Sequence, residues 1–147
     1  MATPDQNIQV ILQVFRAVEQ RDPQGALDLI VPDVEFHWPP PLPYGGVRRG
    51  FNPAGPTWTR TWDPFQPTAA ERSLSPRVIA ASDTEVVVHW CQRGLSPAGD
   101  HIDTPVLGLY RLRDAKLTRA QMFYFDPLAV VNFLAKAGTS AVASAAP

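Results

Sequence analysis

One histidine and two tyrosines are the side chains of this sequence best suited to move a proton or to polarise an oxygen near neutral pH. His89 lies in an apolar, β-branched run, residues 85–91, and an unperturbed imidazole has a pKa of ~6.5, which suits general acid–base catalysis. Tyr44 and Tyr110 can each donate a hydrogen bond to a substrate oxygen and stabilise a developing negative charge. Two interpretations stay open: a catalytic set, or core side chains that satisfy one another or a backbone carbonyl.

Strand alternation indicates which side chains share a face with His89. If the turn at residues 96–99 joins antiparallel strands, His89 lies opposite Val106. Alternation then places His89 and Cys91 on the same face as Tyr110. Because nothing supplies Cys91 with an orienting third group, a small buried side chain is favoured over a thiolate nucleophile.

A proline run ends the first expected strand and forms a rim. Residues 39–43 cannot continue as a central strand, because proline fixes φ and lacks the amide hydrogen. His37, Trp38 and Tyr44 therefore gather where the chain turns, and either His37 or Trp38 could face a pocket. The alternative is a strand end that buries its aromatic side chains beneath a loop.

Three further side chains complete the candidate binding set. Trp58 and Trp62 are four residues apart and would stack on one side of a flat ligand if their segment is helical. Otherwise they are lid residues that seal the pocket. Gln121, on the last expected strand, is a neutral hydrogen-bond donor.

Composition excludes several classes of function. Thirteen basic and fourteen acidic residues give a net charge of -1, so neither nucleic acid nor an anionic membrane surface is an expected partner. We expect a cytoplasmic protein, since no apolar run reaches the ~20 residues of a membrane span and the N-terminus does not resemble a signal peptide. A single cysteine and three scattered histidines predict no disulfide and no metal site.

Periodicity predicts an α+β fold in one domain, residues 1–138, followed by a disordered Ala/Ser-rich tail, residues 139–147. Helical spacing of apolar residues comes first, and the period changes to two from residue 74 onward. The expected helices are 5–20, a short one after Asp22-Pro23, and one after Asp126-Pro127 that stops at Gly138; the expected strands are 33–38, around 78–79, 85–91, 101–112 and 117–125, with an irregular lid at 45–66.

The chain resembles the nuclear transport factor two-like superfamily over about residues 5–135. The resemblance rests on the order of elements, the Asp22-Pro23 break, the strand that leads into the Pro-Tyr-Gly-Gly rim at residues 43–46, and the Phe125-Asp126-Pro127 ending. SnoaL-like polyketide cyclases, ketosteroid isomerases and limonene epoxide hydrolases are the relatives that it suggests. The resemblance implies a cone-shaped barrel: a curved antiparallel sheet with helices packed on its concave face and an apolar pocket inside.

The same resemblance implies that the family's known catalytic groups are missing here. The ketosteroid isomerase positions fall on Val14, Trp38 and Gly108, and the epoxide hydrolase positions on His89, Cys91 and Phe123. The cyclase carboxylate belongs on the last strand, where Gln121 and Phe123 are expected to face the pocket. The resemblance also makes the face that carries His89 the pocket face.

Two functional hypotheses follow, with one expected partner surface. The first is a small cofactor-independent enzyme that uses His89, Tyr110 and Tyr44 for proton transfer. The reaction would be an isomerisation, cyclisation or elimination of an apolar, carbonyl-bearing or polyketide-like molecule. The second is a non-catalytic ligand-binding or scaffolding protein of the same fold. We also expect a homodimer joined through an apolar outer sheet face, to which the expected alternation assigns Trp90, Leu107, Leu109, Met122 and Tyr124.

Overall fold

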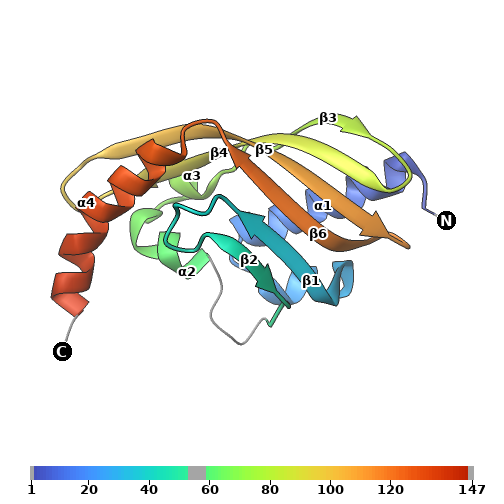
Figure 1. Ribbon diagram of the computed structural model, residues 1–147, viewed down its shortest axis with the longest axis horizontal. Helices are drawn as coiled ribbons and strands as arrows, with labels where there is room; N and C mark the ends of the chain where they lie inside the picture. The colour runs from blue at the N-terminus through green and yellow to red at the C-terminus, as the bar shows by residue number, and fades with distance from the viewer. Residues whose placement is uncertain (1, 53–58, 146–147) are drawn as a thin grey trace.

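The computed structural model describes residues 2–52 and 59–145, which form helices around one six-stranded sheet (Figure 1). The sheet order is β2-β1-β6-β5-β4-β3, and all neighbouring strands are antiparallel except β1 and β6. The helical elements are α1 (Pro4–Glu19), η1 (Pro23–Leu29), α2 (Thr59–Trp62), η2 (Asp63–Phe65), α3 (Ala69–Arg72) and α4 (Pro127–Ala145). The strands are β1 (Ile30–Trp38), β2 (Gly46–Arg49), β3 (Arg77–Ala81), β4 (Glu85–Leu95), β5 (His101–Arg113) and β6 (Lys116–Tyr124).

Helix α1 covers one face of the sheet. Its start is fixed by a capping box, in which the Thr3 side chain accepts from the Gln6 amide and the Gln6 side chain accepts from the Thr3 amide. Ile11 and Phe15, four residues apart, are buried, and the helix packs on β3, β4 and β6. We call the sheet face under α1 the inner face and the opposite face the outer face.

The register of β4 against β5 differs by one residue from the predicted one. Trp90, not His89, lies opposite Val106. The reason is the connection, in which the Ser96 amide donates to the Asp100 carbonyl around a three-residue loop, with Gly99 at φ 93. A one-residue slip exchanges the two faces of a strand, so the prediction for β4 was inverted.

Strand β6 is inverted relative to the prediction for a second reason. The tight Asp114–Ala115 turn has both residues at positive φ and pairs Arg113 with Lys116, which by itself would bring Gln121 opposite Gly108. The register shifts between Arg111 and Leu112, and Met122 lies opposite Gly108 instead. A bulge next to a turn thus reverses which β6 side chains face inward.

Helix α4 continues past Gly138, where the sequence was expected to end it and to begin a disordered tail. The helix extends to Ala145, so the predicted end was wrong. Gly138 does not adopt the positive φ of a glycine cap, and the alanines that follow favour helix. The side chains of the buried first half, among them Phe133 and Leu134, hold α4 against the rest of the protein.

The other predicted elements are confirmed with shifted limits. Elements β2, α2 and η2 lie in the region 45–66 that was expected to be an irregular lid, and α3 follows it as an element that was not predicted. No helix in the ranges 2–52 and 59–145 has the length and apolar character needed to cross a membrane.

Candidate functional site

Aromatic rings fill the space between α1 and the inner face of the sheet. Phe15 of α1 meets Trp90 at 6.1 Å and Tyr110 at 5.6 Å between ring centroids. Trp90 in turn meets Tyr124 at 6.2 Å, and Trp38 meets both Tyr124 and the rim residue Tyr44. All of these contacts are edge to face, the arrangement that aromatic quadrupoles favour. The site is therefore a packed aromatic cluster with a few polar atoms on and beside its rings, which we call the chamber.

Four of these polar atoms form one buried hydrogen-bond chain. Trp62 Nε1 donates to Tyr44 Oη over 3.0 Å, Tyr44 Oη lies 2.9 Å from Tyr124 Oη, and Tyr124 Oη donates to Gln92 Oε1 over 3.3 Å. Because Gln92 Oε1 can only accept a hydrogen bond, the Tyr124 hydroxyl must donate its proton to it. The hydrogen bond between the two tyrosines is therefore donated by Tyr44 and accepted by Tyr124. The chain thus runs in one direction from α2 through the rim to β6 and β4.

Burial keeps the three tyrosines of this site protonated. Desolvation raises the pKa of Tyr44, although its hydrogen bonds with Tyr124 and Trp62 partly oppose this effect. Desolvation also raises the pKa of Tyr124 well above its usual value, and it raises the pKa of Tyr110. The hydroxyls therefore act as neutral hydrogen-bond donors and acceptors, and none is a phenolate base at neutral pH.

Tyr110 and Trp90 form a second polar position beside the chain. A Cβ on Gly108 would lie 2.4 Å from the Tyr110 hydroxyl, so only glycine lets that ring lie across its own strand. Trp90 Nε1 is buried without a hydrogen bond, although it lies toward Tyr110 closely enough to oppose the effect of burial on the pKa of that hydroxyl. A buried indole N–H whose neighbouring hydroxyl lies outside good hydrogen-bond geometry is a donor that a ligand oxygen could use.

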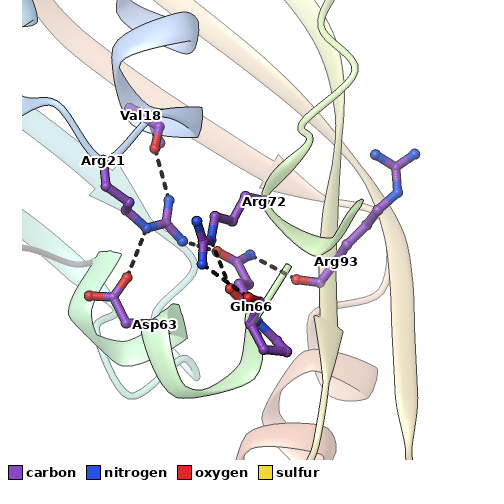
Figure 2. A network of polar contacts seen from close by, with 7 residues as sticks. Val18, Arg21, Asp63, Gln66, Arg72 and Arg93 are labelled. Atoms are coloured by element: carbon purple, nitrogen blue, oxygen red, sulfur yellow. Dashed lines mark hydrogen bonds and ion pairs between the residues drawn. The ribbon is translucent and has the colours of Figure 1, made fainter. Parts of the chain in front are cut away.

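A polar network fixes the segment that carries Trp62 (Figure 2). Arg21 donates to the Val18 carbonyl, to Asp63 and to the side chain of buried Gln66. Gln66 donates to the carbonyl of Arg93 in β4, and Arg72 of α3 donates to the Gln66 carbonyl. We call this network, made by Val18, Arg21, Asp63, Gln66, Arg72 and Arg93, the latch. It ties η2 to the end of α1 and to the sheet, and so holds the Trp62 indole against Tyr44.

Helix α4 closes the chamber at the end where β4 and β5 meet. Phe133 stacks on Trp62 with ring centroids 6.0 Å apart and planes within 8°, and it meets Phe65 edge to face. A Cβ on Gly94 would come within 3.0 Å of Trp62 and 3.2 Å of Phe133, so helix and sheet are in close contact there. The parallel Trp62–Phe133 pair is a stacking geometry that a flat ligand could also adopt.

Comparison of the sequence with models of protein families identifies the family to which this fold belongs. A family model described as the SnoaL-like domain matches residues 11–120. The chain belongs to the SnoaL-like domain family. This agrees with the predicted superfamily and with the α+β cone fold.

Solved structures of similar fold include TerC co-crystallised with polyporic acid, 25% identical, with a TM-score of 0.64 over 85% of this chain and 95% of TerC. Bal32a from a soil-derived mobile gene cassette is 14% identical, with a TM-score of 0.73 over 88% of this chain and 97% of that one. An NTF2-like protein of unknown function from Burkholderia pseudomallei K96243 is 19% identical, with a TM-score of 0.66 over 88% and 96% of the two chains. No curated protein matches the sequence significantly.

Within this SnoaL-like domain, the structure brings together four of the predicted site residues: Tyr44, Tyr110, Trp38 and Trp62 are all buried in the chamber. The choice between His37 and Trp38 is settled, because Trp38 faces inward and His37 pairs with Glu35 on the outer face. Trp58 lies outside the described residues.

The other predicted site residues of the SnoaL-like domain were assigned to the wrong face. His89, Cys91, Gln121 and Phe123 alternate with the buried residues of β4 and β6 and lie on the outer face, where Phe123 is half exposed. The two register changes described above are the cause. His89 is therefore no candidate for a proton carrier inside the chamber.

Sequence reasoning missed Gln92, Trp90, Met122 and Tyr124 as inner residues. One signal was present: Val86, Val88, Trp90 and Gln92 continue a single alternation, and the first two are fully buried. The described residues of this SnoaL-like domain contain no group of three or more histidine, cysteine, aspartate or glutamate side chains placed to hold a metal ion.

Proposed function

We propose that this protein takes a flat, mainly apolar small molecule into its aromatic chamber and binds an oxygen of that molecule through the Trp62–Tyr44–Tyr124–Gln92 chain. The observation that carries the proposal is this buried chain of neutral donors, surrounded by rings. Apolar walls with a few convergent polar atoms are typical of small-molecule sites.

The reaction that we propose is a cofactor-independent isomerisation, cyclisation or elimination on a carbonyl-bearing, polyketide-like molecule. A hydroxyl held in a low-dielectric site stabilises charge that develops on a carbonyl oxygen, and such donors contribute most when they are already oriented. Trp62 and Gln92 orient Tyr44 and Tyr124. Because the Tyr124 proton goes to Gln92 in this structure, a ligand oxygen would replace Gln92 Oε1 as its acceptor. Trp90 Nε1, which is buried without a hydrogen bond, supplies one more donor.

Family membership supports a small-molecule ligand of this kind. TerC, one of the similar structures, was co-crystallised with polyporic acid. We propose that a ligand of comparable shape displaces ring–ring contacts in this chain, starting with the parallel Trp62–Phe133 pair. The ligand would then select a conformation in which α4 lies farther from α2.

A non-catalytic binding protein is the second candidate, and one observation favours it. The polar residues buried in the described part of the chain are Asn7, Gln66, Gln92, Ser96 and Thr104, which carry amides and hydroxyls. Together with tyrosines whose pKa burial raises, they offer no group that exchanges a proton at neutral pH. In the enzyme hypothesis, therefore, water or the substrate's own acidic group must carry the proton.

Titration with polyporic acid tests both candidates. Trp38, Trp62 and Trp90 are buried around the chamber, so we expect saturable quenching of tryptophan fluorescence and a raised melting temperature. Chromatography of the same mixture separates the candidates, since a new product indicates the enzyme and unchanged ligand the binding protein. If quenching does not saturate and the melting temperature stays constant for this compound and for carbonyl-bearing polyketide analogues, the proposal is wrong.

The partner that we propose is a second copy, joined through the outer sheet face. Leu107 and Phe123 lie directly opposite each other in the β5–β6 ladder and are 43% and 50% exposed. Leu109 shares that face as predicted, whereas Trp90, Met122 and Tyr124 lie on the inner face and take no part. A paired apolar surface in the middle of a sheet suits a symmetric contact.

A further inference from the structure

A groove crosses the outer face of the sheet near the β5–β6 turn, on the side opposite the chamber. Its volume is about 270 Å³. Strands β1, β5 and β6 form it, and its lining residues are Val31, Asp33, Glu35, Arg111, Arg113, Thr118 and Arg119. Three guanidinium groups thus meet two carboxylates on a small area of the surface.

Arg119 lies on β6, the strand between the other two that form this groove, and it makes no ion pair with any residue in the ranges 2–52 and 59–145. It is half-buried, and its guanidinium donates to the neutral amide oxygen of Gln121 over 3.2 Å. Across the ladder it lies opposite Arg111, another cation. Like charges opposite each other destabilise a sheet, and a partly desolvated charge needs an opposite charge nearby.

The carboxylate opposite Arg119 on the neighbouring strand already has other partners. Glu35 lies opposite Arg119 in the parallel β1–β6 pair, but His37 donates to its Oε1 and Arg49 to its Oε2. The hydrogen bond from His37 and the charge of Arg49 hold the pKa of Glu35 below its usual value. Glu35 is therefore hydrogen-bonded to His37 and paired with Arg49, neither of which lines the groove, and it makes no ion pair with Arg119.

Arg113 and Arg111 extend the positive surface. In the described part of the chain, Arg113 and Arg119 have no ion pair, and Arg111 approaches Glu85 at 3.5 Å, outside the groove. Asp33 lines the groove and also makes no ion pair there. Two carboxylates and three guanidinium groups therefore line the groove, and of those without an ion pair in that part of the chain one is an acid, Asp33, and two are arginines, which leaves the groove with a net positive charge.

We propose that this groove binds the phosphate group of a small molecule, held by Arg111, Arg113 and Arg119. A carboxylate presents two oxygens and satisfies one guanidinium fork, whereas a phosphate group presents three or more and can bridge several. A phosphate between Arg111 and Arg119 also removes the repulsion of that pair. The site is independent of the chamber, because its residues lie on the other face of the sheet.

Titration with inorganic phosphate at low ionic strength, followed by NMR of backbone amides, tests this. We expect saturable shifts that concentrate on residues 111–119, and weaker binding of acetate at equal ionic strength. Arg119→Gln and Arg113→Gln should each weaken phosphate binding by about tenfold, since each removes one charge-assisted contact. Arg113 is exposed, so its variant is informative even if Arg119→Gln folds poorly.

Arg77→Gln is the matched control. Arg77 is exposed on β3 opposite His89, so its substitution removes one positive charge from the same sheet but none from the groove. Phosphate binding should stay unchanged. Binding that does not saturate, or an equal loss in Arg77→Gln, would overturn the proposal. So would loss of self-association in Arg113→Gln without phosphate binding, because a second copy would then occupy the groove.

Discussion

At the scale of single residues, the inner tyrosines decide what this site can do. The chain has three tyrosines, and all of them are buried around the chamber. Desolvation raises the pKa of each above the usual 10.0, so each remains a neutral donor over the physiological range. Their role follows from burial as much as from residue type.

This burial makes alkaline pH a direct test. In the unfolded chain the tyrosines ionise at about pH 10, while in the folded chain they keep their protons to higher pH. Stability should therefore be constant with respect to these groups below about pH 10 and fall above it, by up to about 1.4 kcal/mol per pH unit for each tyrosine.

Ultraviolet absorbance of tyrosinate, recorded beside a denaturant series at each pH, measures this effect. We expect little tyrosinate at pH 10 in the folded protein, and Tyr110→Phe should lower the slope of stability against pH by about one third. Normal ionisation of even one tyrosine in the native state would show that this ring is exposed.

At the scale of elements, periodicity predicted α1, β1 and the strands β3 to β6, and it placed Tyr110 of β5 on the inner face, but it inverted the faces of β4 and β6. Helix α1 and strands β4 to β6 follow from periodicity, and Tyr44, Tyr110 and Trp62 were identified as site residues. The inversion of β4 and β6 comes from a three-residue loop and from one bulge. Such features depend on backbone geometry at one position and leave the hydrophobic pattern almost unchanged. Phe123 and Tyr124 are both aromatic, so the pattern could not distinguish them.

The latch is the element-scale feature that we expect to control Trp62. Arg21→Ala removes three hydrogen bonds and leaves the buried Gln66 oxygen without its donor. The free energy of unfolding should fall by about 1–3 kcal/mol, and tryptophan emission should shift to the red as the Trp62 segment loosens.

Arg60→Ala is the control, because Arg60 is exposed on α2 itself. Its effect should stay within about 0.5 kcal/mol in the same urea titration. If the two substitutions lower the free energy of unfolding equally, the hydrogen bonds of the latch add nothing to the effect of removing one positive charge.

At the scale of the whole molecule, the two faces of the sheet carry different structural features. The inner face holds the aromatic chamber, and the outer face carries the Leu107–Phe123 pair and, farther along, the arginine groove. In this arrangement a dimer contact over the middle of the outer face leaves the chamber unobstructed.

Phe123→Glu tests the dimer by light scattering at micromolar concentration. Placing a charge at the centre of an apolar contact should convert the dimer into monomers. Ile79→Glu is the control, since Ile79 on β3 is 49% exposed, much like Phe123, and the dimer should persist. A wild-type protein that is monomeric at this concentration would contradict the proposed contact.

We propose that the inner Trp62–Tyr44–Tyr124–Gln92 chain, and not His89 on the outer face, recognises the ligand. The most direct measurement compares the affinity of Tyr124→Phe and His89→Gln for polyporic acid with that of the wild type, by fluorescence titration. Tyr124→Phe keeps the ring but removes the hydroxyl that joins Tyr44 to Gln92. We expect its affinity to fall by about 5- to 30-fold, which corresponds to about 1–2 kcal/mol, while His89→Gln binds like the wild type. Unchanged binding by Tyr124→Phe together with a loss in His89→Gln would place the site on the outer face and contradict this account.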